Sequence, residues 1–209
     1  TEFLECIYGT RKLAGGEVVI DGKTMTRPTP SESIRQGIAF ICEDRRGKAM
    51  IPAFSVEENM MLSSIDRYTK SGWFQKRAAD KKAMDMIEAL KIKCVGVSQP
   101  AKELSGGNQQ KVFLARWLNT DAEILLLDNP TQGIDVGAKA EIYKLILELA
   151  KQGKTILINT LEIPEIQKVA DYCAVFYNGE IIKVLEHQEI DEMTVMMYST
   201  NAAQAEEGK

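Results

Sequence analysis

The aliphatic run Ile124–Leu127, which ends in Asp128, is the feature that most limits how this chain can fold. A short run of Ile and Leu between polar residues is typical of a buried strand. The segment 138–149 follows as an amphipathic helix, and its apolar face is predicted to carry Ile142, Leu145, Ile146 and Leu149. Further buried strands are predicted over 155–158 and 174–177. Strands that alternate with helices predict an α/β fold with a mainly parallel sheet flanked by helices.

Other segments extend this pattern upstream. Strands are predicted over 17–20 and 38–42, and helices over 31–36, 56–90 and 105–118. Within 56–90, near-helical spacing predicts one apolar face formed by Ala83, Met84, Ile87 and Leu90. The methionines of this segment are interpreted as core filling, since Met fits irregular gaps. Asp21-Gly22 and Asn178-Gly179 are turn signals.

Composition excludes several classes of protein. The 209 residues carry a net charge of −4 with no long basic block, which argues against a nucleic-acid binder. Four scattered cysteines and a single histidine, His187, form no zinc-like spacing. No apolar run approaches the ~20 residues that a membrane span requires. A cytosolic protein, or one held at a membrane face by a partner, is expected.

The segment Ser105-Gly106-Gly107 precedes a predicted helix and can form an anion-binding turn. Ser105 can cap the helix, and the two glycines would let a phosphate approach the backbone amides closely. The start of a helix also carries a partial positive charge. A plain Ser-Gly-Gly helix cap explains the same residues about equally well, so the motif alone leaves both interpretations open.

Asp128 follows Ser105 by 23 positions and is itself followed, seven positions later, by Asp135. The carboxyl end of a parallel strand is where α/β sheets bind ligands, and an aspartate there can help to hold Mg²⁺ in a phosphate-loop ATPase. A single aspartate after a strand is weak evidence, but its combination with the Ser-Gly-Gly helix start favours a nucleotide site.

Three segments together resemble the ABC ATPases. LSGGNQQKV over 104–112 resembles the signature motif, and its Gln-Gln-Lys ending is typical of the second half of monosaccharide importers of the ribose, galactose and xylose class. Residues 124–139 resemble the Walker B strand and the D-loop. AFICEDRR over 39–46 is similar to the Q-loop region. The resemblance implies an ABC-type phosphate-loop ATPase core with an inserted helical subdomain.

The resemblance also implies domain limits. Residues 1–185 would form the nucleotide-binding domain, with the helical subdomain at about 55–103, and 186–209 a C-terminal extension with a disordered end from about Ser199. Thr1 would match the hydroxyl residue that ends Walker A, so the core is expected to be N-terminally incomplete, with its phosphate loop outside the chain.

The roles that the resemblance implies concern ATP and Mg²⁺. Thr1 and Asp128 would bind Mg²⁺. Asp128 and Asn129 would occupy the catalytic positions of the site. The residues expected to bind ATP are Thr1, Glu43, Ser105, Gly106, Gly107, Asn108 and Asp135. Asp135 would also communicate across a dimer of nucleotide-binding halves.

Three positions depart from the pattern of an active site. Asn129 stands where the glutamate after Walker B is expected, and an amide cannot accept a proton from water at neutral pH. Leu161 stands at the position of the switch histidine, which many sugar-importer second halves also lack. Glu43 replaces the Q-loop glutamine. We therefore expect a degenerate site at Asp128 and an intact signature turn that completes a competent site on another half.

The implied partners are a homologous N-terminal nucleotide-binding half, transmembrane permease subunits and, indirectly, a sugar-binding protein, at the cytoplasmic face of the membrane. The main alternative is a non-hydrolysing nucleotide-binding or regulatory module, which Asn129 favours. A chromosome- or repair-type ATPase is disfavoured, because about sixty residues separate Glu43 from Leu104 and show no sustained heptads. A ribosome-acting ABC protein lacks support from any basic linker.

Overall fold

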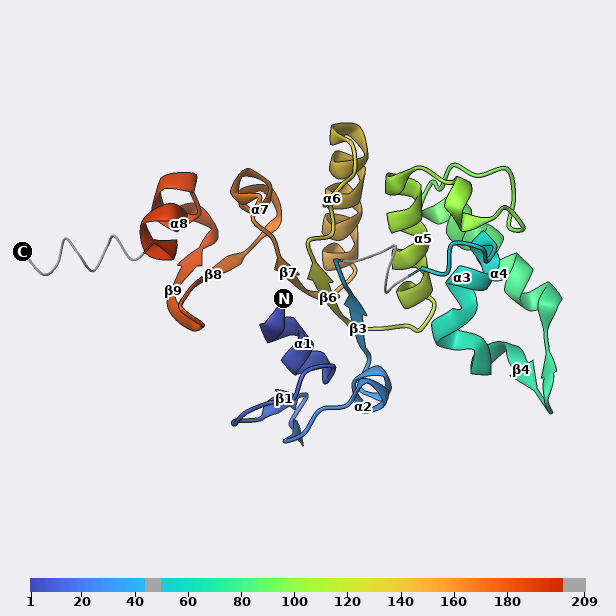
Figure 1. Cartoon of the computed structure of the whole chain (residues 1–209), viewed down its shortest axis with the longest axis horizontal. Helices are drawn as coiled ribbons and strands as arrows, with labels where there is room; N and C mark the ends of the chain where they lie inside the picture. Colours follow the sequence, from blue (N-terminus) through green and yellow to red (C-terminus); the bar gives the residue numbers. More distant parts are fainter. Residues whose placement is uncertain (44–49, 201–209) are drawn as a thin grey trace, which may run out of the picture. The chain divides into compact units, whose positions relative to one another are not determined.

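The computed structural model describes residues 1–43 and 50–200, and the chain divides into two compact units, Thr1–Asn159 and Thr160–Lys209 (Figure 1). The first unit contains a three-stranded parallel sheet in the order β3-β6-β7. Its strands are β3 (Ile38–Ile41), β6 (Ile124–Asp128) and β7 (Thr155–Asn159). This sheet confirms the predicted α/β architecture.

Burial differs between these strands. The aliphatic side chains of β3 and of Leu125–Leu127 are buried, as the apolar run predicted. β7 was also predicted to be buried, but its residues 156–159 are only half-buried and Thr155 is exposed. Within the described residues β7 pairs with β6 alone, so it is an edge strand with less of its surface covered.

Four helices of the first unit lie near this sheet: α1 (Glu2–Tyr8), α2 (Pro30–Arg35), α5 (Gly106–Leu118) and α6 (Val136–Lys151). The first three contact β3, and α6 contacts β7. The predicted apolar face of α6 is confirmed, because Ile142, Ile146 and Leu149 are buried and Leu145 is half-buried.

A small hairpin joins α1 to α2. Its strands β1 (Val18–Ile20) and β2 (Lys23–Met25) are antiparallel. Asp21 and Gly22 form the turn with φ of 49° and 76°, the left-handed pair that a two-residue hairpin of this type requires. The sequence signal for this turn is therefore confirmed.

The segment predicted as helical over 56–90 is interrupted by a hairpin. It contains α3 (Val56–Met61), the 3₁₀ helix η2 (Leu62–Tyr68), strands β4 (Thr69–Lys70) and β5 (Trp73–Phe74), and α4 (Lys76–Ala89). Ser71 and Gly72 form its turn with positive φ, 50° and 81°. A Ser-Gly pair marks turns, and here it overrides the helical periodicity around it.

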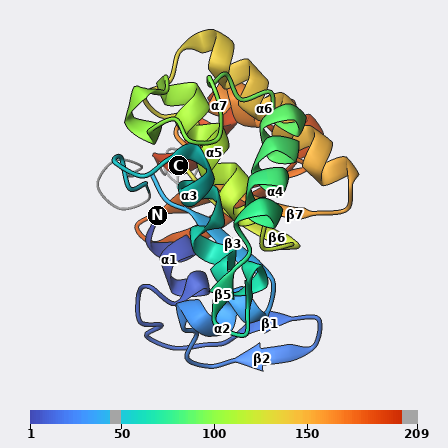
Figure 2. The same cartoon turned by 90° about the vertical axis from the view of Figure 1, so that its right-hand side faces the viewer.

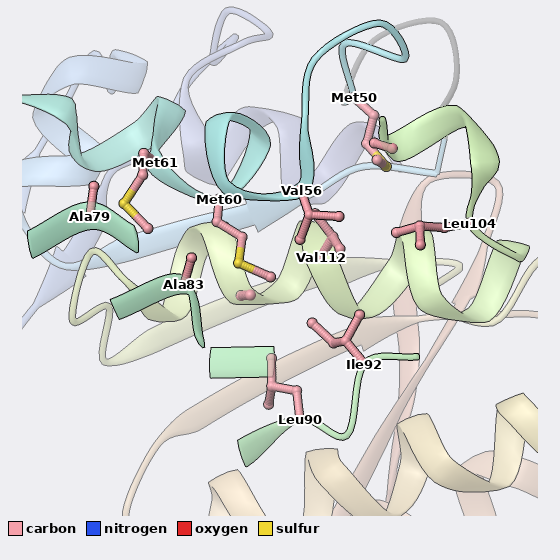
Figure 3. Close-up of a cluster of buried hydrophobic side chains, with 12 residues drawn as sticks. Met50, Val56, Met60, Met61, Ala79, Ala83, Leu90, Ile92, Leu104 and Val112 are labelled. Atoms are coloured by element: carbon pink, nitrogen blue, oxygen red, sulfur yellow. The ribbon is translucent and has the colours of Figure 1, made fainter. Parts of the chain in front are cut away.

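The segment 50–104 shares one apolar core with α5, which α3 contacts directly (Figure 2). Figure 3 shows this core, in which Met60 and Met61 of α3 lie beside Ala79 and Ala83 of α4. Its members are Met50, Val56, Met60, Met61, Ala79, Ala83, Leu90, Ile92, Ala101, Leu104, Val112 and Ala115. The 3₁₀ turn η3 (Ala101–Glu103) leads from it to α5. Core filling is confirmed for these methionines but not for Met84, which is 54% exposed.

The second unit is a hairpin packed on short helices. It contains α7 (Ile163–Val169), β8 (Tyr172–Tyr177), β9 (Glu180–Glu186), the 3₁₀ turn η4 (His187–Glu189) and α8 (Glu192–Ser199). Asn178 and Gly179 form the predicted turn, with φ of 47° and 83°. Val175, Leu185, Ile190 and Val195 make its core. The prediction of a wholly buried strand at 174–177 is wrong, because β8 exposes alternate side chains and only Val175 is buried.

The predicted disordered end of the chain lies, from residue 201, outside the described residues, whereas Ser199 ends α8. Among the helices of the described residues, none has the length and apolar character to cross a membrane.

Tyr8 of α1 gives the fold a predicted pH dependence. Its ring is 6% exposed and packs against Phe40 and Trp117, at centroid distances of 5.3 and 6.1 Å. Burial raises the pKa of Tyr8 to about 12. Because the pKa of Tyr8 is higher in the folded protein than in the unfolded chain, its contribution to the free energy of unfolding is fully present below pH ~10. This contribution is lost as the pH rises toward 12.

We therefore expect Tyr8→Phe to reduce the loss of unfolding free energy between pH 9 and 12 by up to ~2.7 kcal/mol, the equivalent of two pKa units. Urea unfolding at several pH values measures this. Tyr172→Phe, at an exposed tyrosine, serves as the matched control. An unchanged alkaline slope in Tyr8→Phe would show that Tyr8 does not cause it.

Candidate functional site

Asp128 lies at the carboxyl end of β6 and is 1% exposed. The hydroxyl of Thr1 donates a hydrogen bond to Asp128 Oδ1 at 3.1 Å, so the structure brings together the two residues predicted to bind Mg²⁺. The side-chain amide of Asn159 donates to the same oxygen at 2.6 Å. Asn159 was not predicted, although its position is one residue beyond the predicted strand 155–158, and register places it directly opposite Asp128.

The oxygen atoms of this group suit a hard divalent cation. A hydroxyl and a carboxylate are ligands that Mg²⁺ accepts, and Mg²⁺ commonly completes its shell with water and phosphate oxygens instead of more protein groups. Within the described residues, no three His, Cys, Asp or Glu side chains gather as a complete metal site. Thr1 and Asp128 therefore fit a Mg²⁺ ion that arrives with a phosphate ligand.

Asn129 follows Asp128 in a fixed turn at the same edge of the sheet. Its φ is 44°, a left-handed conformation that Asn tolerates better than most residues. Its backbone amide donates to the carbonyl of Asn159 at 2.8 Å, and its carbonyl accepts from the amide of Gln132 at 3.1 Å. The backbone of Asn129 is thus held at the carboxyl end of β6, next to Asp128.

The second group of predicted residues lies where α5 begins. Ser105 occupies the N-cap position, as predicted, but its side chain makes no capping hydrogen bond. Its hydroxyl oxygen instead accepts from the side-chain amide of Asn108 at 2.9 Å. Asn108 also accepts from the backbone amide of Lys93 at 2.8 Å. Asn108 therefore fixes the Ser105 hydroxyl relative to the loop after α4.

Gly106 is half-buried and Gly107 is buried. A Cβ atom added at Gly107 would lie 2.6 Å from Cβ of Ala138 in α6, a separation that real side chains do not show. Packing against α6 therefore requires a glycine at 107 independently of any ligand.

Asp135 begins α6 as its N-cap. Its Oδ1 accepts from the backbone amide of Ala138 at 2.9 Å, which satisfies one of the unpaired amides of a helix start. Sequence reasoning gave Asp135 a role across a dimer but did not foresee this capping bond. An Asp three residues before Ala138, at the start of the predicted helix 138–149, is a signal that could have found it.

The last two positions singled out in the sequence are Glu43 and Leu161. Glu43 is half-buried in the loop after β3, and the rest of the predicted Q-loop region, 44–46, lies outside the described residues. Leu161 is 91% exposed.

Comparisons with known proteins identify relatives of this chain. The ABC transporter family profile matches residues 1–132. A ribose import ATP-binding protein of Halalkalibacterium halodurans is 42% identical over 200 residues, which cover 96% of this chain and 40% of that protein. The D-allose import ATP-binding protein of Escherichia coli K12 is 40% identical over 204 residues, covering 95% of this chain and 40% of that protein. The chain thus spans about 40% of the length of these relatives.

The chain also has the same fold as solved structures. An ATP-binding cassette of an ABC transporter superposes with a TM-score of 0.80 at 25% identity, covering 95% of this chain and 81% of that one. A nucleotide-free cassette gives a TM-score of 0.77 at 26% identity, covering 94% and 81%.

Proposed function

We propose, since this chain belongs to the ABC transporter family, that it is one nucleotide-binding half of the ATPase of a monosaccharide importer. Similarity to ribose and D-allose import ATP-binding proteins supports the substrate class. The observation that carries the nucleotide site is the hydrogen bond from Thr1 to Asp128 at the carboxyl end of a buried parallel strand. Hydroxyl, carboxylate and sheet edge are the parts that such an ATPase uses for Mg²⁺-ATP.

At the Asp128 site, Thr1 and Asp128 would hold the Mg²⁺ that neutralises charge on the ATP phosphates. Asn159 orients the Asp128 carboxylate by donating to Oδ1. Asn129 can hydrogen-bond a water molecule but cannot remove its proton. Glu43, in the loop after β3, would add negative charge near the γ-phosphate. We therefore infer that this site binds nucleotide and hydrolyses it slowly.

The turn Ser105–Gly107 would serve a second site, on a homologous half. The first backbone amides of α5, a helix of 13 residues, lie at the positive end of its dipole. They suit the phosphates of an ATP held by the other half. The Ser105 hydroxyl, positioned by Asn108, and Asp135 would complete this contribution.

The helical subdomain at about 55–103 would face the permease subunits, and through them the ATPase would respond to an extracellular sugar-binding protein. The protein would then lie peripherally at the cytoplasmic face of the membrane. A net charge of −4 gives no support for a nucleic-acid partner.

A second candidate function is a non-hydrolysing regulatory module, and Asn129 is the observation that favours it. ATP turnover in a two-half assembly separates the two. A transport ATPase hydrolyses ATP at the site completed by Ser105–Gly107, whereas a regulatory module binds ATP without turnover at either site.

The signature turn is tested by Gly106→Asp. An aspartate at the first residue of α5 suits the helix dipole, so we expect folding to be maintained. The same carboxylate would repel a triphosphate, and ATP turnover at the partner's site should fall at least ~10-fold, which equals about 1.4 kcal/mol of repulsion. Steady-state ATPase assays on the assembly, together with thermal unfolding of the chain, measure both effects.

Gly15→Asp is the matched control, because it adds the same charge at a glycine with open space around it. It should leave ATP turnover unchanged. Full turnover in Gly106→Asp would contradict the assignment of this turn to the nucleotide.

A further inference from the structure

We propose that Gly107 is a positioning residue that couples the signature turn to Asp135 through α6. A Cβ atom added at residue 107 would lie 2.6 Å from Cβ of Ala138. Neither atom can avoid the other by rotating a side chain, because both are attached directly to a backbone. The two helices can therefore approach this closely only with glycine at 107.

Ala138 takes part in two interactions at once. Its methyl group faces Gly107, and its backbone amide donates to Asp135 Oδ1 at 2.9 Å. A displacement of α5 that pushes on the methyl group must also move the amide that Asp135 caps. The signature turn and the start of α6 are therefore connected through one residue.

An ion pair holds the same two helices one turn further along. Lys111 Nζ donates to Glu141 Oε2 at 2.6 Å and to the carbonyl of Lys91 at 3.2 Å. Lys111 is four positions after Gly107, and Glu141 is three after Ala138, so both contacts lie on the facing sides of α5 and α6. Lys111 is buried and Glu141 is exposed. Two successive contacts oppose rotation of one helix on the other.

The geometry gives Gly107 a role that differs from admitting a phosphate to the backbone. If access were its only role, a methyl group at 107 would interfere with nucleotide whatever residue stood at 138. If packing is its role, removing the methyl group of Ala138 should make room for one at 107. The pair of substitutions Gly107→Ala and Ala138→Gly separates these roles.

The first arm of the experiment is amide hydrogen exchange on the chain without nucleotide. Gly107→Ala should speed exchange in the first turn of α6, at residues 138–139, about tenfold, within the range of couplings between contacting residues. In the Ala138→Gly background the same substitution should change exchange less than about twofold. If Gly107→Ala is too unstable for exchange measurements, thermal unfolding of the single and double variants is compared instead. Adding Ala138→Gly must then restore the thermal midpoint. Equal effects in both backgrounds would overturn the coupling.

The second arm rests on the proposed function and measures ATP turnover at the partner's site. Gly107→Ala should lower turnover about tenfold or more, since small misplacements of a positioning group have effects of that size. The double variant should return to within about threefold of Ala138→Gly alone. Loss of turnover in both backgrounds with unchanged exchange would assign Gly107 to phosphate access instead. If the unmodified assembly shows no turnover, the proposed function fails, and the exchange arm alone decides the coupling.

Discussion

Replacing Asn129 by glutamate is expected to raise ATP turnover at the Asp128 site by about 10²–10⁴, the usual contribution of a general base. The residue follows the proposed Mg²⁺ ligand directly and is held in place by the hydrogen bond from its amide to Asn159. A carboxylate there can accept the proton of an attacking water, whereas the amide cannot. Single-turnover hydrolysis measures this in the two-half assembly, with the other half's own general base removed.

The backbone at Asn129 makes a length-matched control necessary. At a φ of 44°, a residue with a longer side chain than Asn is more strained, and the strain is of order 1 kcal/mol. Asn129→Gln introduces the same length and strain without a base, so it should leave turnover at its low value. Equal turnover in Asn129→Glu and the unmodified chain would show that this residue does not limit the site. A rise in both variants would mean that side-chain length, and not basicity, matters.

The parallel sheet could be predicted because its central strand is marked unambiguously. A short aliphatic run such as Ile124–Leu127 between polar residues favours a buried strand, and the fold confirms a strand in which Leu125–Leu127 are buried. The burial of β7 could not be predicted in the same way. Its residues 156–158 are as aliphatic as Leu125–Leu127 of β6, but burial depends on how many neighbours a strand has in the sheet, which is not a property of its own sequence.

The candidate site, too, could be predicted from the sequence only in part. Thr1 and Asp128 were expected together from a resemblance to a family, and a hydrogen bond joins them. Asn159 was missed because its amide reaches Asp128 only through the register of β6 and β7, which local sequence does not reveal. Gly107 was interpreted either as an aid to phosphate access or as part of a plain helix cap, and its packing on α6 was missed because Ala138 lies more than thirty positions away.

Asn59 of α3 connects the loop that precedes α3 to α5. It is fully buried, and its Oδ1 accepts from the backbone amide of Ile51 and from Arg116 Nη2, both at 3.0 Å. Its amide donates to the carbonyls of Ile51, Phe54 and Ser55 at 3.0–3.2 Å. Its backbone carbonyl accepts from Arg116 Nε at 2.7 Å. The loop that leads into α3 is thus tied to α5 through one side chain.

The charge of Arg116 makes these bonds costly to lose. Its side chain is buried, and burial lowers the pKa of Arg116 to about 10, because the charged form is poorly solvated there. The Arg116 guanidinium carbon lies over the ring of Phe113, 5.1 Å from the ring centroid, and this contact replaces only part of the lost hydration. The hydrogen bonds to Asn59 therefore help to stabilise this charge in the interior.

Asn59→Ala is accordingly expected to lower the free energy of unfolding by about 3–5 kcal/mol, because it removes one hydrogen bond to a charged group, which contributes about 1.5–3 kcal/mol, and several neutral ones of about 1 kcal/mol each. That is a large part of the ~5–15 kcal/mol typical of a folded domain. Equilibrium unfolding in urea measures the change. Arg77→Met, at an exposed arginine of α4, is the control and should change stability by no more than about 0.5 kcal/mol.

A double-mutant cycle with Arg116→Met identifies the cause of this loss. Met removes the charge but keeps much of the apolar stem, so the hydrogen bond from the guanidinium to Asn59 Oδ1 is then absent in either case. We expect the two substitutions together to cost at least ~1 kcal/mol less than the sum of the single costs, as contacting residues do. Additive costs would mean that Asn59 stabilises the loop at 51–55 without supporting the guanidinium, and the link between that loop and α5 would then have to be carried by the apolar core alone.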